Sequence, residues 1–269
     1  MSIARYRRCL QGVIWREAMR FAQQRERFFA ALVRPLIWLF IFAAGFRSVL
    51  GVSIIPPYDT YITYEVYVLP GLVGMIQLFN GMQSSLSMVY DREMGSMRVL
   101  LVSPLPRWYL LICKLTAGVV VSLLQVYAFL AIAWAFGIGV APIGYLAVLP
   151  ALVLSGLMLG SVGLLLSSLI RQLENFACVM NFVIFPMFFA SSALYPLWRL
   201  QEANDLLHDV ATANPFTHAV ELIRFALYGS FNPMAAAAVL ASLALFLGAA
   251  IFAYDPARGL TARLGGGAG

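Results

Sequence analysis

Charged residues are scarce in this sequence, and lysine is almost absent. Only 11% of the 269 residues are charged and 62% are hydrophobic, whereas a soluble domain usually carries about 25% charged residues. Basic residues outnumber acidic ones by 18 to 12, but they flank apolar runs and do not gather in one patch. This distribution argues against a nucleic-acid partner. It predicts an integral membrane protein whose arginines act as topology signals and head-group anchors.

Motifs for nucleotide hydrolysis, metal chemistry and acyl transfer are also missing. A phosphate-binding P-loop needs Gly-x-x-x-x-Gly-Lys-Ser/Thr, but the single lysine, Lys114, is flanked by Cys113 and Leu115. No cysteine or carboxylate completes a zinc-like set with His208 and His218 at helical spacing, and no Gly-x-Ser-x-Gly elbow occurs. We therefore expect no catalytic residue, metal or cofactor in this chain.

Long uncharged stretches predict transmembrane helices. The first, 66–90, has 25 residues and reaches about 37 Å as a helix, enough for a hydrocarbon core about 30 Å thick. The second, 115–170, is about twice as long as one span, so it must turn, and glycines and a proline at 137–144 mark the turn. The sequence therefore predicts an all-α integral membrane protein, with six transmembrane helices in a domain over 28–254. The spans are expected at about 28–50, 65–89, 109–136, 145–168, 175–194 and 233–254.

The two ends of the chain differ from these spans. Residues 1–27 carry apolar side chains at steps of three and four, with arginines on the other side. This pattern predicts an amphipathic helix in the head-group plane, and the alternative is a basic tail without fixed orientation. Residues 255–269 are a glycine-rich tail.

The positions of the basic residues predict the orientation of the chain. With the N-terminus inside, 15 of the 18 basic residues fall on the cytoplasmic side, in agreement with the positive-inside rule. We therefore expect a protein of the cytoplasmic (inner) membrane with both termini in the cytoplasm. Residues 90–108 then face the cytoplasm, 195–232 lie outside, and the 255–269 tail is cytosolic.

A charged segment at 90–108 interrupts the apolar sequence, and charges set between two such runs must protrude from the bilayer. Its clustered charges are Asp91, Arg92, Glu93 and Arg98. If 91–102 forms a helix, its apolar face contains Met94, Met97 and Leu101. Ser-Pro-Leu-Pro at 103–106 would end that helix. Such a helix suits docking into a groove on another protein, and a position on the membrane surface is an equal alternative.

The second expected span carries a polar face. Gln77, Asn80 and Ser84 are spaced three and four residues apart, so they share one side of a helix. This face is a candidate pathway lining or dimer interface, and ordinary hydrogen bonding between helices is the alternative. Essentially no ionisable residue lies inside spans two to six, which argues against a proton-coupled transporter or a selective ion channel.

Two segments resemble motifs of the ABC-2-type transporter permeases. Residues 90–107, YDREMGSMRVLLVSPLPR, resemble the cytosolic signature of that family, in which acidic-Arg-Glu-x-Gly-Thr/Ser leads into Leu-Leu-x-Ser/Thr-Pro. The sequence departs from it at 94–97, where Arg or Lys and Thr are commoner. Residues 214–224, NPFTHAVELIR, resemble the outer motif before the last span. The resemblance extends over the whole chain.

The resemblance implies a dimeric permease, expected as a homodimer in contact with membrane lipids, and a separate ATPase subunit that binds ATP. It also implies that 195–232 forms short helices dipping into the outer leaflet. The similar families export drugs, lipid-linked glycans or nodulation factors, so we expect outward movement of an amphiphilic, lipid-like or drug-like substrate. The resemblance identifies the coupling helix, and the ATPase-coupling residues are then Asp91, Arg92, Glu93, Met94, Gly95, Met97, Arg98 and Leu101.

Two other functions remain open at this point. A membrane-embedded lipid-modifying enzyme would need polar catalytic groups near a leaflet surface, and only 202–224 offers candidates. These are Glu202, Asp205, His208, Asp209, His218 and Glu221. A non-transporting membrane scaffold or channel is the other possibility.

Overall fold

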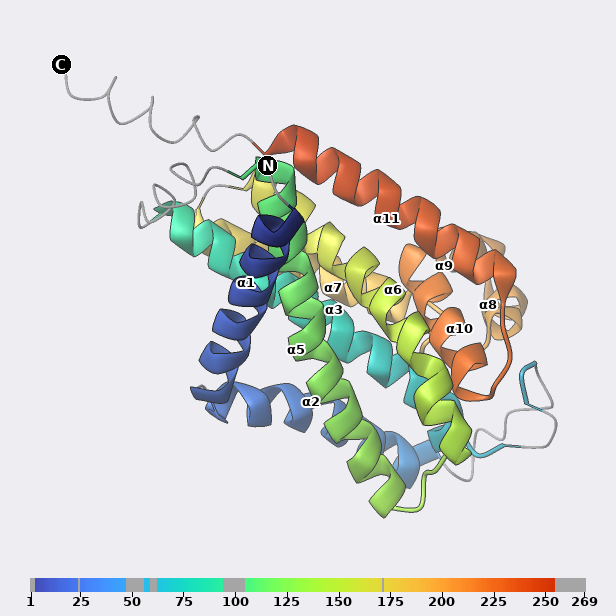
Figure 1. Ribbon diagram of the computed structural model, residues 1–269. Coiled ribbons are helices and arrows are strands. Elements are labelled where there is room, and N and C mark those ends of the chain that lie inside the picture. The colour runs from blue at the N-terminus through green and yellow to red at the C-terminus, as the bar shows by residue number, and fades with distance from the viewer. Residues whose placement is uncertain are drawn as a thin grey trace.

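The computed structural model describes residues 3–23, 25–46, 56–58, 62–93, 105–170 and 172–254. The regular elements in these ranges are all helices (Figure 1), so the expected all-α class is confirmed. They are α1 (Ile3–Gln23), α2 (Arg25–Phe46), α3 (Tyr64–Glu93), α5 (Arg107–Ala135), α6 (Pro142–Leu169), α7 (Leu173–Phe189), α8 (Leu197–Ala203), α9 (Asp205–Ala213), α10 (Pro215–Leu227) and α11 (Pro233–Ala253).

Three of these helices are long and apolar enough to cross a membrane. They comprise Trp108–Ala135 within α5, Pro142–Leu169 (α6) and Pro233–Ala253 (α11), and they coincide with the third, fourth and sixth expected spans. Two apolar helical stretches are shorter, Leu32–Ile41 within α2 and Leu173–Phe189 (α7). The number of six spans therefore stays a prediction.

Helix α6 lies inside the bundle and packs against α3, α5, α10 and α11 (Figure 1). The backbones of α3 and α6 approach closely at Gly81 and Gly160, where a Cβ on Gly81 would lie 2.8 Å from the Cα of Gly160. Helices in membranes use small residues for such close contacts, because the apolar solvent gives no hydrophobic drive for association. Tyr67, Phe129 and Phe216 are among the large side chains that are fully buried.

Helix α3 is longer than the sequence predicted. The expected span was 65–89, followed by a separate helix from residue 91, but α3 runs without a break from Tyr64 to Glu93. No glycine or proline occurs in 82–93, so nothing in that stretch interrupts the helix. The backbone of 91–93 is therefore the last turn of α3.

Helix α7, in contrast, ends earlier than expected. The fifth span was placed at 175–194, but α7 ends at Phe189. The side-chain amide of Asn214 donates to the carbonyl oxygens of Met187 and Ala190, at 2.8 and 2.6 Å. These bonds satisfy carbonyl groups that have no partner within the helix, and they come from a residue that no local pattern around 189 reveals.

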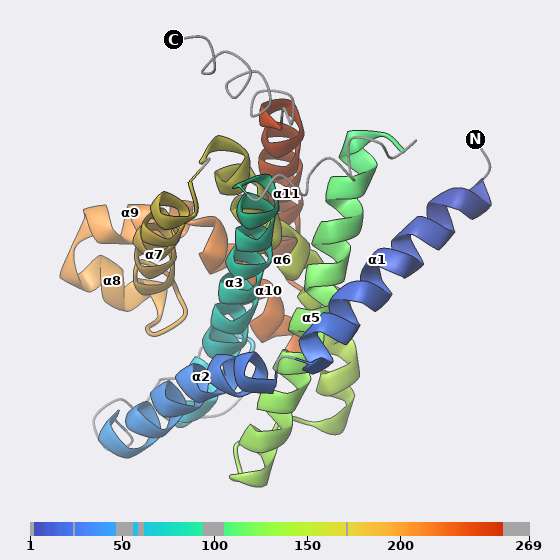
Figure 2. The ribbon, with the colours of Figure 1, turned by 90° about the vertical axis from the view of Figure 1, so that its left-hand side faces the viewer.

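Residues 190–232, here named the cap, contain the short helices α8, α9 and α10. Helices α8 and α9 pack on each other, and α9 contacts α10; Figure 2 shows α8 and α9 away from α5. Helix α10 instead enters the bundle and contacts α3, α6 and α11. The resemblance implied short helices at 195–232, and the structure contains them; their depth in the outer leaflet stays a prediction.

Helices α1 and α2 were expected as a head-group helix at 1–27 and a first span at 28–50, and the structure places both against the bundle. α1 slants along α5 (Figure 2), and the hydroxyl of Tyr109 donates to the carbonyl oxygen of Tyr6 at 2.6 Å. α2 runs across α3 in both views (Figures 1 and 2), with the guanidinium of Arg34 3.9 Å from the ring centre of Phe79. The head-group position of 1–27 and the first span at 28–50 therefore stay predictions.

Candidate functional site: the ends and the polar face of α3

Helix α3 carries the polar face that the sequence selected and the first three of the predicted coupling residues. Asp91, Arg92 and Glu93 form the end of its backbone, so the proposed coupling segment continues directly from this helix. The remaining predicted coupling residues lie outside the described residues, and their role stays a prediction. They are Met94, Gly95, Met97, Arg98 and Leu101.

The polar face of α3 is turned toward α5 and α6 of the same chain. Gln77 is buried, and its side-chain amide donates to the carbonyl oxygen of Leu152 on α6 at 2.7 Å. The amide of Asn80 donates to the side-chain oxygen of Gln125 on α5. These contacts are ordinary hydrogen bonds between helices, which was the alternative interpretation of the polar face. A role in a pathway or a dimer interface stays a prediction.

Ser84 completes this face and contacts α5 at Gly118, whose lack of a side chain allows the two helices to come close. A Cβ added to Gly118 on α5 would lie 2.9 Å from the Oγ of Ser84. The Oγ of Ser122 lies 3.4 Å from the amide nitrogen of Asn80. Sequence reasoning did not select Ser122 and Gln125, although polar residues three apart in an uncharged run are a usable signal.

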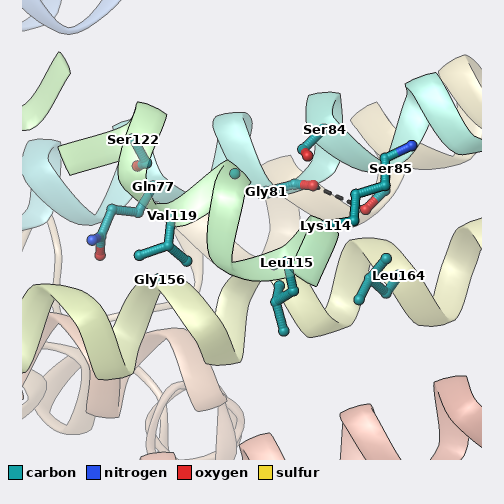
Figure 3. A pocket seen from close by; sticks show the side chains of 12 residues that line it. Gln77, Gly81, Ser84, Ser85, Lys114, Leu115, Val119, Ser122, Gly156 and Leu164 are labelled. Carbon is teal, nitrogen blue, oxygen red and sulfur yellow. Dashed lines mark hydrogen bonds between the residues drawn. The ribbon is translucent and has the colours of Figure 1, made fainter. Parts of the chain in front are cut away.

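A narrow pocket lies between α3, α5 and α6 (Figure 3). Gln77 and Ser122 line one end, and Ser84, Ser85 and Lys114 line the other. The side-chain oxygen of Gln77 is buried without a hydrogen-bond partner among the described residues. The pocket has room for roughly one water molecule, which needs 2–4 polar partners. In this conformation it is too small for an amphiphilic substrate.

The motif at 214–224 connects α7, α9 and α10. Besides capping α7, Asn214 accepts a hydrogen bond from the backbone nitrogen of Phe216 at 3.0 Å, which is the usual role of an N-cap residue. The hydroxyl of Thr217 donates to the carbonyl oxygen of Ala211 on α9 at 2.6 Å. Pro215 occupies the first helical position, where a missing N–H costs nothing.

The polar groups considered for an enzyme do not form a metal site. His208 and Asp209 are neighbours, with a 3.5 Å separation between Nδ1 and Oδ1. Glu221 instead pairs with Arg224 on its own helix. Within the described ranges, no group of three or more His, Cys, Asp and Glu side chains is placed to hold a metal ion. Among the contacts described, Glu202, Asp205 and His218 bind neither the His208–Asp209 pair nor the Glu221–Arg224 pair.

The fold defines an integral membrane protein: its long apolar helices surround an interior that contains hydrogen-bonded amides and serines. A comparison with known protein families then shows the family to which the chain belongs. The sequence profile of the ABC-2 type transporter family matches residues 8–228, so the chain belongs to this family. The resemblance seen at 90–107 is thereby confirmed.

Individual relatives carry names of transport permeases. The chain is 27% identical over 234 residues to the putative transport permease ycf38 of Pyropia yezoensis, covering 83% of this chain and 75% of that protein. It is 33% identical over 171 residues to the probable multidrug ABC transporter permease YbhR of Escherichia coli K12, covering 62% of this chain and 45% of YbhR. Nodulation protein J of Rhizobium leguminosarum bv. viciae is 27% identical over 208 residues, which are 74% of this chain and 73% of that protein. The chain is therefore a transport permease subunit.

Proposed function

We propose that the chain is the membrane-spanning subunit of an ATP-binding cassette exporter that moves an amphiphilic, lipid-like or drug-like substrate outward. ATP binds to a separate ATPase subunit, and this chain supplies the coupling surface and the pathway. The family match over 8–228 carries the proposal. A relative named as a probable multidrug ABC transporter permease supports a drug-like cargo.

The proposed topology has both termini in the cytoplasm and the chain in the cytoplasmic membrane. The positions of 15 of the 18 basic residues support it. Figure 2 is compatible with it, because the start of α1, the end of α11 and the Glu93 end of α3 lie toward the same end of the bundle. The Tyr64 end of α3 and the cap then face outward.

The coupling mechanism follows from the continuity between α3 and the segment after it. Nucleotide binding closes the ATPase subunits, which press on residues 91–103. Glu93 and Arg98 make polar contacts to the ATPase, and Met94, Met97 and Leu101 are its apolar anchors. Because 91–93 are helical with α3, pressure there moves α3 as a whole.

The proposed homodimer and its lipid contacts are supported by apolar surface on α7 and α11. Phe182 and Phe185 on α7 are exposed, as are Leu245 and Phe252 on α11. An apolar surface of this extent marks contact with another protein or with lipid. In the proposal, a second copy and the acyl chains share this surface, and substrate leaves between the two copies.

A double variant at the coupling segment tests this function. The chain is coexpressed with its partner ATPase, the complex is purified, and permease-stimulated ATP hydrolysis is measured. Glu93→Ala with Met97→Ala is expected to reduce the stimulation at least about tenfold, because about 1.4 kcal/mol of coupling contacts is enough for that loss. Arg199→Ala, an exposed arginine on the cap, is the matched control. Unchanged stimulation in an intact complex of the double variant would remove the coupling role.

A further inference from the structure

Arg224 on α10 is a buried charge that the proposed function leaves unused. Its side chain is only 3% exposed. A guanidinium keeps its charge inside a protein, and an uncompensated buried charge is costly. The contacts that compensate this charge therefore indicate which parts of the molecule Arg224 holds together.

Arg224 contacts three elements at once. Its Nη1 pairs with Glu221 one turn earlier on α10. Its Nη2 donates to the carbonyl oxygen of Ser192, at 2.8 Å, in the turn that follows α7. Its guanidinium carbon lies 4.2 Å from the ring centre of Tyr67 on α3. The planar fork of arginine makes these contacts together, whereas a lysine ammonium cannot reproduce both the fork and the stacking.

Two tyrosines of α3 strengthen the same junction. The hydroxyl of Tyr67 donates to the carbonyl oxygen of Ser192 at 3.0 Å, so Tyr67 and Arg224 share one acceptor. The hydroxyl of Tyr64 donates to the carbonyl oxygen of Leu194 at 2.6 Å. We name this junction the clamp; it consists of Tyr64, Tyr67, Ser192, Leu194, Glu221 and Arg224.

A third tyrosine lies beside the clamp. The ring centre of Tyr58 lies 6.5 Å from that of Tyr67 and 4.7 Å from that of Tyr228. Burial raises the pKa of Tyr58, so its phenol stays neutral. The Glu221 carboxylate is therefore the negative partner of Arg224 among these side chains.

The clamp lies at one end of α3, and the proposed coupling segment begins at the other. The helix has 30 residues and a length of about 45 Å at 1.5 Å per residue. It is one continuous helix that contains Pro70 near the clamp, and it packs along α6. A displacement that starts at Glu93 therefore reaches the cap through the clamp.

We propose that Arg224 is a positioning residue that couples the cap to α3, so that ATPase-driven movement of α3 rearranges the turn after α7. This inference rests on the proposed function, because it requires an ATPase acting at the Glu93 end. It assigns the motif at 214–224 a role in transmitting movement. A purely structural Arg224 would stabilise the fold without affecting a nucleotide response.

The test uses a thiol reporter within the clamp. Ser192 is buried, and Ser192→Cys changes only the side-chain atom while keeping the carbonyl acceptor. The reporter is placed in a chain in which Cys9, Cys113 and Cys178 are serine. The complex with its ATPase is reconstituted in lipid nanodiscs, which leave both faces open to solvent, and a maleimide is added with and without a non-hydrolysable ATP analogue. Ser230→Cys, on the exposed part of the cap, is the control reporter.

We expect the analogue to change the labelling rate of Ser192→Cys by about five- to tenfold, the scale of one or two buried hydrogen bonds. Ser230→Cys should label readily and show no response. Adding Arg224→Met should abolish the response of Ser192→Cys, and Arg224→Lys should restore only part of it. A full nucleotide response in the Arg224→Met chain would overturn the inference.

Folding and the proposed function are checked separately. Gel filtration of the complex shows whether Arg224→Met still assembles; if it does not, Tyr67→Phe keeps the ring and removes one hydrogen bond, and a full response there contradicts the clamp. A parent chain that binds and stimulates its ATPase but shows no response at Ser192→Cys refutes the clamp alone. A parent chain that neither binds nor stimulates the ATPase refutes the proposed function.

Discussion

Helices α10 and α11 follow one another in the chain and pack together, yet they relate to their surroundings in opposite ways. α10 carries Arg224, Glu221 and Thr217 and is mostly buried, whereas α11 has no charged residue and only four buried residues. A soluble protein would bury the more apolar helix. In a bilayer the apolar helix faces lipid, and the polar one is enclosed where its groups find partners. In this pair of helices, the charged residues therefore lie on the helix that is enclosed by the bundle.

The largest difference between these helices should appear when one phenylalanine on each is truncated. Phe216 on α10 is fully buried, and Phe252 on α11 is 94% exposed. Phe216→Ala should lower the free energy of unfolding by about 3–5 kcal/mol because it leaves a cavity. Phe252→Ala should change it by less than about 0.5 kcal/mol. SDS-induced unfolding of the purified chain in mixed micelles measures both, and equal losses would contradict the comparison.

A smaller difference in unfolding free energy is expected between lysine substitutions at two exposed leucines, one on a spanning helix and one on the cap. Leu245 on α11 is 66% exposed and Leu206 on α9 is 70% exposed, but we place Leu245 in the hydrocarbon core and α9 no deeper than the head-group layer of the outer leaflet. Leu245→Lys should therefore cost about 2.5–3.5 kcal/mol, the penalty for a lysine at the centre of a spanning helix. Leu206→Lys should cost about 0.5 kcal/mol or less. Unfolding in lipid bicelles gives both values, and a similar penalty for Leu206→Lys would place α9 in the hydrocarbon core instead of the head-group layer.

Much of the fold could be predicted because its signals are local. The run over 115–170 predicts α5, the turn and α6 from the absence of charge and the position of Gly137, which has a positive φ in the turn. The match of 90–107 to a family motif also needs only consecutive residues. Both patterns can be recognised in the sequence without knowing which residues pack against them.

The rest depends on partners that are distant in the sequence. Arg224 counted as one of three outside arginines in the topology prediction, but it is buried because Tyr67 and Ser192 meet it from other elements. The end of α7 at Phe189 depends in the same way on Asn214. Gln77 bonds to a backbone carbonyl on α6, and a carbonyl carries no signal in the sequence.

The central claim, that a cytoplasmic ATPase acts on the segment after α3, is tested most directly by the accessibility of one introduced thiol. Ser96→Cys, in a chain whose native cysteines are serine, is treated with an impermeant maleimide in intact cells and in inverted membrane vesicles. We predict no labelling in cells, labelling in the vesicles, and protection of at least about tenfold when the ATPase subunit is bound, because a docked helix excludes solvent. Labelling from the outside, or equal labelling with and without bound ATPase, would contradict the account.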